Sequence, residues 1–469
     1  MTNLVEFALS ALSLLVILIV RRCRAPQAKA PPVFPYQIPW IGLASTFSYG
    51  AFKHLLQAHR IFGSLQPVTF VVAGKRIHVF THPRDITAVY RNKLDLSFEK
   101  TVETFFLGCD YPSDPESISR LRTLLDSQHT LFATHMSPTK TVDIVRSMLP
   151  IMQSQVTKLA QHTEEVDLFE WSYSALTTAV LTAMWGPRLL AESPELIPTL
   201  RKLDDDMLKL SAGFPKWMRR NETAHLEAVI GMFRNYYRVP QTEGPSVTKD
   251  RAIECFEIGC TVDEVAAQNT FLVFGFTTNM PRHAAWATYW VSQDRHLLER
   301  IRNEIEPAFK REEVDTDHLM TKCPVFKAAW NESIRVSGSA QSSRSVLRDT
   351  KIGEYEVKEG SIVLCVSRSA QTLEDVWGPN PEEFNADRFL NNPALERSPY
   401  FRPFGGGTSL CAGRHMAARI GLTFTATLLR QFEIDADRTE VSIESPLLAG
   451  TFRPKDTMRA KIRERDIAA

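Results

Sequence analysis

Hydrophobic positions divide the chain into an apolar N-terminal stretch and a long body of mixed pattern. The stretch from Leu4 to Val20 is apolar apart from Glu6, Ser10 and Ser13. Its 17 residues come near the lower length limit of a helix that spans a bilayer. The pattern therefore predicts a transmembrane anchor over residues 1–20.

The charges that flank the apolar stretch indicate its orientation. Arg21, Arg22 and Arg24 follow it at once, whereas residues 1–3 carry no positive charge. A cleaved signal peptide has its basic residues before the apolar run, so an uncleaved single-pass anchor is the favoured reading. The basic flank predicts that the rest of the chain lies on the cytosolic side.

A basic and proline-rich linker is expected over residues 21–45. Five prolines fall between residues 25 and 40, and this density favours a stiff extended segment over a helix. Such a segment would hold the body at a fixed distance from the membrane. An ordinary linker is the alternative, and the composition does not separate the two.

The body, residues 46–469, is predicted to be mainly helical with small sheets. Apolar residues recur at three-to-four spacing in Val142 to Leu159 and Leu297 to Phe309, which predicts helices there. Short apolar runs predict strands at Val68–Val72, Arg76–Phe80 and Ser361–Val366. No Gly/Ser linker, repeat or low-complexity block interrupts the body, so we expect one large unit.

One long helix has a clear beginning and an expected kink. Thr261 and Glu264 form a capping-box pattern ahead of an apolar run that continues to about Val291. Pro281 has no N–H, so the helix should kink where the carbonyl of Thr277 loses its partner. With Gly275 and the neighbouring polar residues, the kink suits a buried polar pocket. On this segment alone, a plain structural bend is the simpler reading.

Charge and cysteine content narrow the class of protein. The chain of 469 residues has 55 Lys and Arg against 54 Asp and Glu, so its formal charge is +1. This balance argues against a nucleic-acid-binding protein that relies on phosphate attraction. Its seven cysteines are scattered without a CxxC pair, which argues against a disulfide framework and favours a reducing compartment.

The segment Phe404-Gly-Gly-Gly-Thr-Ser-Leu-Cys411-Ala-Gly413-Arg414 carries the candidate chemistry. Its glycines allow the backbone to turn tightly against a bulky neighbour. A helical pattern follows, so Cys411 lies at a helix N-terminus, where the helix dipole favours a thiolate. Such a thiolate serves as a nucleophile or a metal ligand, although a lone buried cysteine is usually structural. Zinc is disfavoured because no second ligand stands at finger-like spacing.

The pattern Phe404-x-x-Gly407-x-x-x-Cys411-x-Gly413 resembles the haem-binding signature of the cytochrome P450 family. Two further motifs occur in the order and spacing of that family. Glu332-Ser-Ile-Arg335 resembles its E-x-x-R motif, and Phe384-Asn-Ala-Asp-Arg388-Phe389 resembles its F-x-P-x-R-F segment, with Ala386 in place of proline. Together with the anchor and linker, these motifs cover nearly the whole chain.

The resemblance implies the fold and the cofactor. The expected fold is the helix-rich P450 fold, with haem b (iron protoporphyrin IX) between two long helices. Cys411 would be the proximal iron ligand, and its thiolate would push electron density onto the iron. Phe404, Gly407 and Gly413 would shape the loop around the haem. Glu332, Arg335 and Arg388 would form a charge-paired lock behind it.

The chain also departs from the usual family pattern. Thr278 and Asn279 occupy the kink positions where most members have an acid followed by threonine, and these two residues are the catalytic candidates. Asn279 near a proline resembles the branch that contains cholesterol 7α-hydroxylase and prostacyclin synthase. Arg344, in the same branch pattern, would bind a haem propionate.

Two other positions differ from the propionate-binding pattern of the family. Ser409 stands where many members have an arginine, and Leu125 and His129 align with the W-x-x-x-R motif. His129 is therefore a further propionate donor by resemblance, or an ordinary partly exposed histidine.

The resemblance supports more than one function. A monooxygenase would take two electrons from NADPH through a partner NADPH–cytochrome reductase and insert one atom of O2 into a lipophilic small molecule. Loss of the acid–threonine pair favours a haem-thiolate isomerase or dehydratase, which needs no reductase. A haem-binding carrier or sensor is the third reading. Arg414 and Arg419 would lie on the face that meets an acidic reductase, or on an ordinary solvated helix face.

The resemblance places the walls of the substrate pocket in segments that vary within the family. The expected segments here are Phe105–Tyr111, Met207–Phe214, Phe271–Thr278 and Ser339–Ser345. The Leu, Phe and Met residues among them imply a lipophilic ligand, such as a terpenoid, sterol or polyketide. The divergent kink and the short anchor are similar to those of fungal biosynthetic members of the family. The anchor would place the protein in the endoplasmic reticulum membrane.

Overall fold

The computed structural model describes residues 30–36, 42–111, 114–160, 165–211, 215–239, 246–310, 313–442 and 450–466. The predicted anchor over residues 1–20 and most of the predicted linker lie outside this part of the chain. Within it, no helix combines the length and apolar character that crossing a membrane requires. The anchor therefore stays a prediction from the sequence.

Helices make up most of the body. They are α2 Ala44–Phe62, α3 Pro83–Arg91, α4 Glu99–Gly108, α5 Pro115–His135, α6 Lys140–Ala160, α7 Leu168–Trp185, α8 Pro187–Glu192, α9 Leu196–Ser211, α10 Arg220–Tyr237, α11 Ser246–Glu257, α12 Val262–Thr277, α13 Met280–Ser292, α14 Arg295–Ile305, α15 Thr316–Thr321, α16 Pro324–Ser337, α17 Glu374–Trp377, α18 Asp387–Asn391 and α19 Arg414–Gln431.

Short strands form small sheets. They are β1 Val68–Val72, β2 Lys75–Phe80, β3 Leu96–Ser97, β4 Val166–Asp167, β5 Phe309–Lys310, β6 Glu313–Val314, β7 Gly338–Ser339, β8 Gln341–Val346, β9 Thr350–Ile352, β10 Tyr355–Val357, β11 Ile362–Val366, β12 Phe432–Ala436, β13 Gly450–Thr451 and β14 Arg459–Glu464. The largest sheet has the order β1-β2-β11-β8-β3, and only its β2–β11 pair is parallel.

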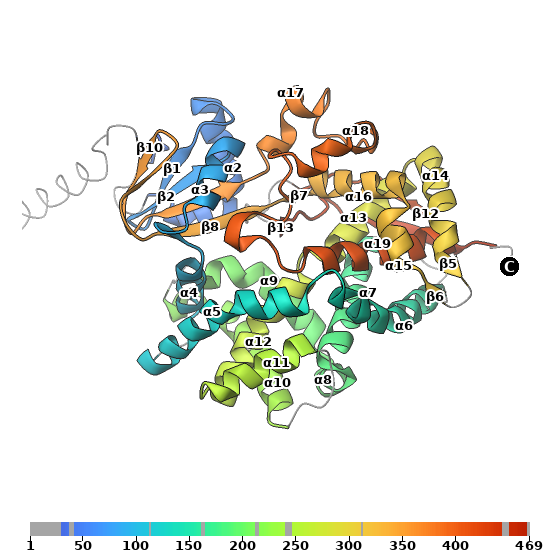
Figure 1. Cartoon of the computed structure of the whole chain (residues 1–469), viewed down its shortest axis with the longest axis horizontal. Helices are drawn as coiled ribbons and strands as arrows, with labels where there is room; N and C mark the ends of the chain where they lie inside the picture. The colour runs from blue at the N-terminus through green and yellow to red at the C-terminus, as the bar shows by residue number, and fades with distance from the viewer. Residues whose placement is uncertain are drawn as a thin grey trace, which may run out of the picture.

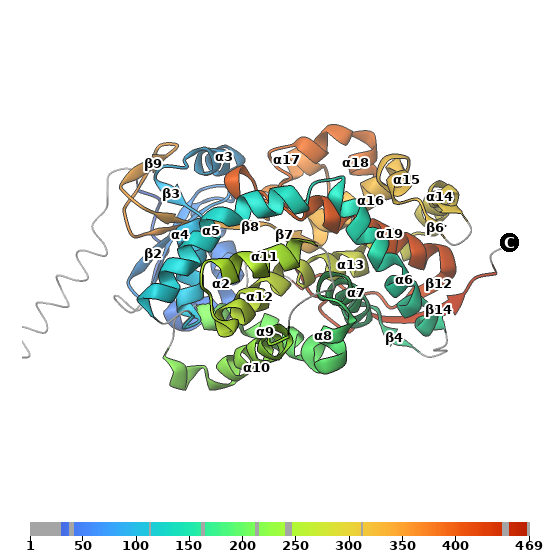
Figure 2. The same ribbon diagram turned by 60° about the horizontal axis from the view of Figure 1, so that its bottom comes forward.

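The sheet and the helical body occupy opposite ends of the molecule. Figure 1 shows the large sheet with α2 and α3 at one end and α6, α14 and α19 toward the other. Separate apolar clusters pack between the sheet and α2 and between the sheet and α3, while one large core fills the helical body. Figure 2 shows α5 beside α11, with which it packs. This arrangement confirms the predicted mainly helical fold with small sheets.

Most of the predicted elements are present. Strands β1, β2 and β11 and helix α6 match their predicted positions within a residue or two. The helix predicted over Leu297 to Phe309 was placed too far toward the C-terminus, because α14 ends at Ile305. Pro307 offers no N–H to continue the helical ladder, so a short 3-10 turn follows and Phe309 begins β5.

The long kinked helix is two helices. Thr261 caps α12 with the full predicted capping box, in which its side chain accepts from the Glu264 N–H and the Glu264 carboxylate accepts from the Thr261 N–H. The helix ends at Thr277, and α13 begins at Met280 with Pro281 in its first turn. The kink prediction is confirmed, but the expectation of one continuous helix to Val291 is wrong. Pro281 cannot donate to Thr277, and the helical hydrogen-bond ladder is interrupted at Thr278 and Asn279, although both residues keep right-handed helical backbone angles.

Candidate functional site

The loop before α19 is held tightly against Tyr90 of α3. The N–H of Cys411 donates to the carbonyl of Phe404 at 3.0 Å, which closes the loop. Gly407 has φ +64°, and a Cβ atom there would lie 2.8 Å from the backbone oxygen of Tyr90. A side chain at this position would be strained and would collide. The predicted close approach of a glycine loop to a bulky neighbour is confirmed.

Cys411 lies three residues before the first residue of α19 and is exposed. Protein still surrounds its sulfur enough for desolvation to raise the pKa of the thiol. The N–H groups of Gly413 and Arg414 and the charge of Arg414 lower this pKa only in part. The expectation that the helix N-terminus favours a thiolate here is therefore incomplete. A stable thiolate needs a further positive partner, such as a metal ion at the sulfur.

Arg344 is a buried cation beside this loop. It stands on β8 and donates to the Ser342 hydroxyl at 2.6 Å and to the Ser343 carbonyl at 2.7 Å. Its other terminal nitrogen donates to the Ser409 hydroxyl in the cysteine loop. Its guanidinium also lies over the ring of Tyr90, and burial lowers its pKa. Within the described residues, no carboxylate lies at ion-pair distance from it.

Taken together, these residues fit a haem cofactor. A buried guanidinium without an acidic partner is costly unless an anion neutralises it, and a propionate supplies that anion. Arg344 reaches Ser409, so β8 delivers a guanidinium to the loop position where many family members carry their own arginine. In the last turn of α12, Gly275 is exposed, and a Cβ there would meet no atom within 4 Å. The helix can therefore accept a flat group close to its backbone.

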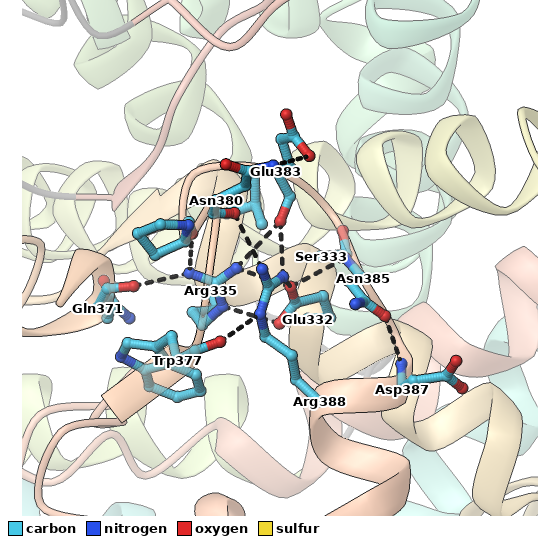
Figure 3. Close-up of polar contacts among 12 residues, drawn as sticks. Glu332, Ser333, Arg335, Gln371, Trp377, Asn380, Glu383, Asn385, Asp387 and Arg388 are labelled. Atoms are coloured by element: carbon cyan, nitrogen blue, oxygen red, sulfur yellow. Dashed lines mark hydrogen bonds and ion pairs between the residues drawn. The ribbon is translucent and has the colours of Figure 1, made fainter. Parts of the chain in front are cut away.

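Glu332 joins two arginines in a buried cluster, which Figure 3 shows. Arg335 donates to both Glu332 oxygens, at 2.8 and 2.7 Å, and Arg388 donates to one of them at 2.7 Å. The side chains of Glu332 and Arg335 are 0% exposed. The lock predicted from the two motifs is confirmed by this geometry.

The remaining arginine nitrogens of the lock hold backbone carbonyls of the segment that leads to the cysteine loop. Arg335 donates to Gln371 at 2.7 Å, and Arg388 donates to Trp377 at 2.7 Å and to Asn380 at 2.9 Å. Arg335 also lies over the Trp377 ring, 4.9 Å from its centroid. The motifs do not predict these partners, because backbone carbonyls have no sequence signal. The lock thus fixes irregular chain between α16 and α18.

Thr278 and Asn279 form the break between α12 and α13. The helical ladder stops with the Thr278 N–H on the Phe274 carbonyl and resumes with the His283 N–H on the Asn279 carbonyl. The hydroxyl of the preceding Thr277 is buried and donates to its own helix at Val273. Thr278 is half-buried, and no side-chain hydrogen bond is formed by it among the described residues. Its hydroxyl is thus free to bind a water.

Asn279 is tied to a segment 172 positions away. Its Oδ1 accepts from the Thr451 N–H at 3.0 Å, and its backbone oxygen accepts from the Thr451 hydroxyl at 3.1 Å. No sequence pattern predicts this partnership, because β13 is only two residues long. The predicted catalytic candidate is therefore also a structural anchor.

The other predicted residues are placed as follows. His129 lies in α5, and its side chain is outside the described part. Leu125 of the same helix packs against Phe106 in a small apolar cluster. Arg419 is buried, with an ion pair to Asp317 at 2.6 Å, so its expected place on a docking face is wrong. Arg414 is half-buried at the start of α19 and donates to the Cys411 carbonyl.

Comparison with known proteins agrees with this geometry. The family model "Cytochrome P450" matches residues 257–459, which include the helix break, the lock and the cysteine loop. A cytochrome P450 monooxygenase of Penicillium decumbens (calL) is 23% identical over 89% of this chain and 88% of its own length. Cytochrome P450 7B1 of Mus musculus is 22% identical over 96% and 93%.

The fold comparison extends over the whole body. A cyanobacterial P450 structure, described as retinoic acid bound CYP120A1, superposes with a TM-score of 0.72 at 17% identity and covers 94% of this chain and 100% of its own. The chain carries a cytochrome P450 domain over residues 257–459, and its relatives and fold neighbour are cytochrome P450 proteins that match most of the chain. It is accordingly a monooxygenase of the haem-thiolate class, and its cofactor is haem b.

Proposed function

We propose that the protein is a membrane-anchored haem-thiolate monooxygenase that inserts one atom of O2 into a lipophilic small molecule. The observation that carries this proposal is that buried Arg344 of β8 donates to Ser409 in the same glycine loop that holds Cys411. Cys411 supplies a sulfur ligand, and Arg344 supplies a cation that has no acid partner among the described residues. This combination suits an iron porphyrin with propionate side chains.

Each site residue has a role in holding the cofactor. Cys411 would bind the iron, and Arg344 would neutralise a propionate, with His129 as a second donor. Phe404, Gly407 and Gly413 give the loop its shape. When bound, haem supplies the activation of O2 and the transfer of one oxygen atom, with two electrons from NADPH. The lock around Glu332 keeps the supporting segment rigid.

Thr278 and Asn279, at the break between α12 and α13, would take part in proton delivery. The hydroxyl of Thr278 and the amide of Asn279 both form hydrogen bonds and can hold a water. Neither passes a proton as readily as a carboxylic acid. This departure from the usual acid–threonine pair favours a second candidate function, a haem-thiolate isomerase or dehydratase that acts on an already oxidised substrate and needs no reductase.

The substrate is proposed to be lipophilic because aromatic rings line the predicted pocket segments. Phe271 of α12 lies 4.2 Å from Phe106 and 5.7 Å from Phe105, measured between ring centroids. Met207 of α9 is buried on another predicted segment. Apolar walls with few polar groups are typical of small-molecule pockets. Relatives that include fungal monooxygenases support a role in a secondary-metabolite pathway, and we propose a terpenoid, sterol or polyketide as the substrate.

The proposed location follows from the N-terminal sequence. An apolar stretch followed by three arginines supports single-pass anchoring in the endoplasmic reticulum membrane, with the catalytic body in the cytosol. This placement would bring the body beside a membrane-bound NADPH–cytochrome reductase.

Reconstitution with purified reductase tests the proposal. We expect NADPH consumption coupled to a hydroxylated product from extracts of a deletion strain, in which the natural substrate accumulates. Conversion of a peroxide substrate without reductase would support the isomerase instead. Retention of haem without either reaction would refute both and leave a carrier or sensor.

A further inference from the structure

The short strand β13 is wedged beside the helix break. Gly450 pairs with Ser339 and Thr451 pairs with Gly338 of β7. The next residue, Phe452, donates its N–H to the Ser337 carbonyl at 2.8 Å and accepts from the Trp286 indole at 2.8 Å. Trp286 belongs to α13, so β13 is fixed to the helix downstream of the break as well as to β7.

The same segment is tied to α9. Arg453 pairs with Asp205 and lies 3.6 Å from Asp204. Asp204 also pairs with buried Arg282, which follows the break in α13. The position of β13 is therefore set by three surrounding elements and not by Asn279 alone.

The contact between β13 and Asn279 fixes which end of the amide faces the strand. The Thr451 N–H must have an acceptor, and Oδ1 lies 3.0 Å from its nitrogen. Gly450 has φ +88°, and a Cβ atom there would lie 2.7 Å from the same Oδ1. Oδ1 thus fills a slot that exists only because residue 450 has no side chain.

The other end of the amide is free. Asn279 is exposed, and among the described residues no hydrogen-bond partner is found for its Nδ2. With Oδ1 held by Thr451, this side chain presents N–H donors on its open side. A freely rotating amide would instead present either donors or an acceptor.

We propose that β13 is a positioning element for the reaction, in which Thr451 and Gly450 lock Asn279 so that it offers only N–H donors at the helix break. The inference rests on the proposed function, because it assigns the donors to the oxygen-binding side of the haem. It makes Thr451 and Gly450 positioning residues. The acceptor that the donors serve is an oxygen atom of bound O2, of a water or of the substrate.

Three variants separate the contact between Thr451 and Asn279 from the N–H donors of the Asn279 amide. Asn279→Asp keeps an oxygen for the Thr451 N–H but removes the amide donors. Gly450→Ala keeps the amide but places a methyl group in the Oδ1 slot. Asn279→Ala removes both functions. Gly360→Ala is the matched control, because Gly360 has φ +77° and a Cβ there meets no atom within 4 Å. It reproduces the backbone strain without the contact.

Site-resolved hydrogen exchange of the Thr451 amide measures the strength of its hydrogen bond to Asn279 in the haem-loaded protein. Loss of one hydrogen bond should accelerate its exchange about tenfold in Asn279→Ala and Gly450→Ala. Asn279→Asp and Gly360→Ala should exchange like the wild type. Unchanged exchange in Asn279→Ala, or equal acceleration in the two glycine variants, would overturn the claim that Thr451 and Gly450 hold the Asn279 amide.

The carbon–oxygen stretching band of the reduced carbon-monoxide complex reports the donors. We expect Asn279→Asp and Gly450→Ala to shift this band in the direction of Asn279→Ala, and Gly360→Ala to leave it unchanged. A wild-type band in Gly450→Ala would overturn the positioning role. Neither readout requires reductase or substrate, so a failure of monooxygenase turnover would refute the proposed function without deciding this inference.

Discussion

Replacing Glu332 by glutamine should strongly destabilise the protein. The substitution keeps the side-chain volume but removes the negative charge that Arg335 and Arg388 share at 2.7 Å. Glu332 and Arg335 are fully buried, so the cations left behind cannot be solvated. Removing one partner of a buried ion pair costs about 3–5 kcal/mol. For a chain of this size we expect the thermal midpoint of unfolding to fall on the order of 5 °C.

The control is the same chemical change in an exposed pair. Glu306 binds Arg430 through both oxygens, with distances of 2.9 and 3.1 Å, but its side chain is 52% exposed. Glu306→Gln should cost at most about 1 kcal/mol. Both variants are followed by circular dichroism at matched haem content, because haem binding itself stabilises the folded state. Equal shifts in the two variants would refute the argument that burial makes the lock important.

Three further predictions concern other parts of the site and the core. Burial lowers the pKa of His78 to about 4, so between pH 6.5 and 4 the unfolded chain binds a proton that the folded protein does not. The free energy of unfolding should therefore fall by up to about 3 kcal/mol as pH drops through this window. In His78→Gln, the free energy of unfolding measured with urea should depend less on pH. Arg344→Met should lose haem to apomyoglobin about tenfold faster, without a lower unfolding midpoint of the apoprotein; retention at the wild-type rate would exclude a propionate contact. Gly407→Ala should lower the free energy of unfolding by about 1–3 kcal/mol through strain and the collision with Tyr90, whereas an unchanged free energy of unfolding would contradict the tight loop.

Local signals predicted the elements and the lock. The capping box at Thr261 and the apolar spacing of α6 depend on neighbours within a few residues, so the sequence displays them directly. Glu332 and Arg335 are one helical turn apart on α16, and the resemblance supplied Arg388. These features required no knowledge of how distant segments meet.

Contacts between distant segments were not predictable in this way. Thr451 holds Asn279 from 172 residues away, and Arg344 reaches Ser409 from 65 residues away. Arg419 was misplaced for the same reason, since its partner Asp317 is 102 residues upstream and draws it inward. The spacing of apolar residues indicates whether a segment is a helix or a strand, but it does not indicate which distant side chain will contact that segment.

The reduced carbon-monoxide spectrum of the Cys411 variants tests the central claim most directly. The purified protein should contain haem b and show the Soret shift that only a thiolate ligand produces, and Cys411→Ala should abolish this shift. The same shift in Cys411→Ala, or purified protein that holds iron through a nitrogen ligand, would contradict the assignment of Cys411 as the iron ligand.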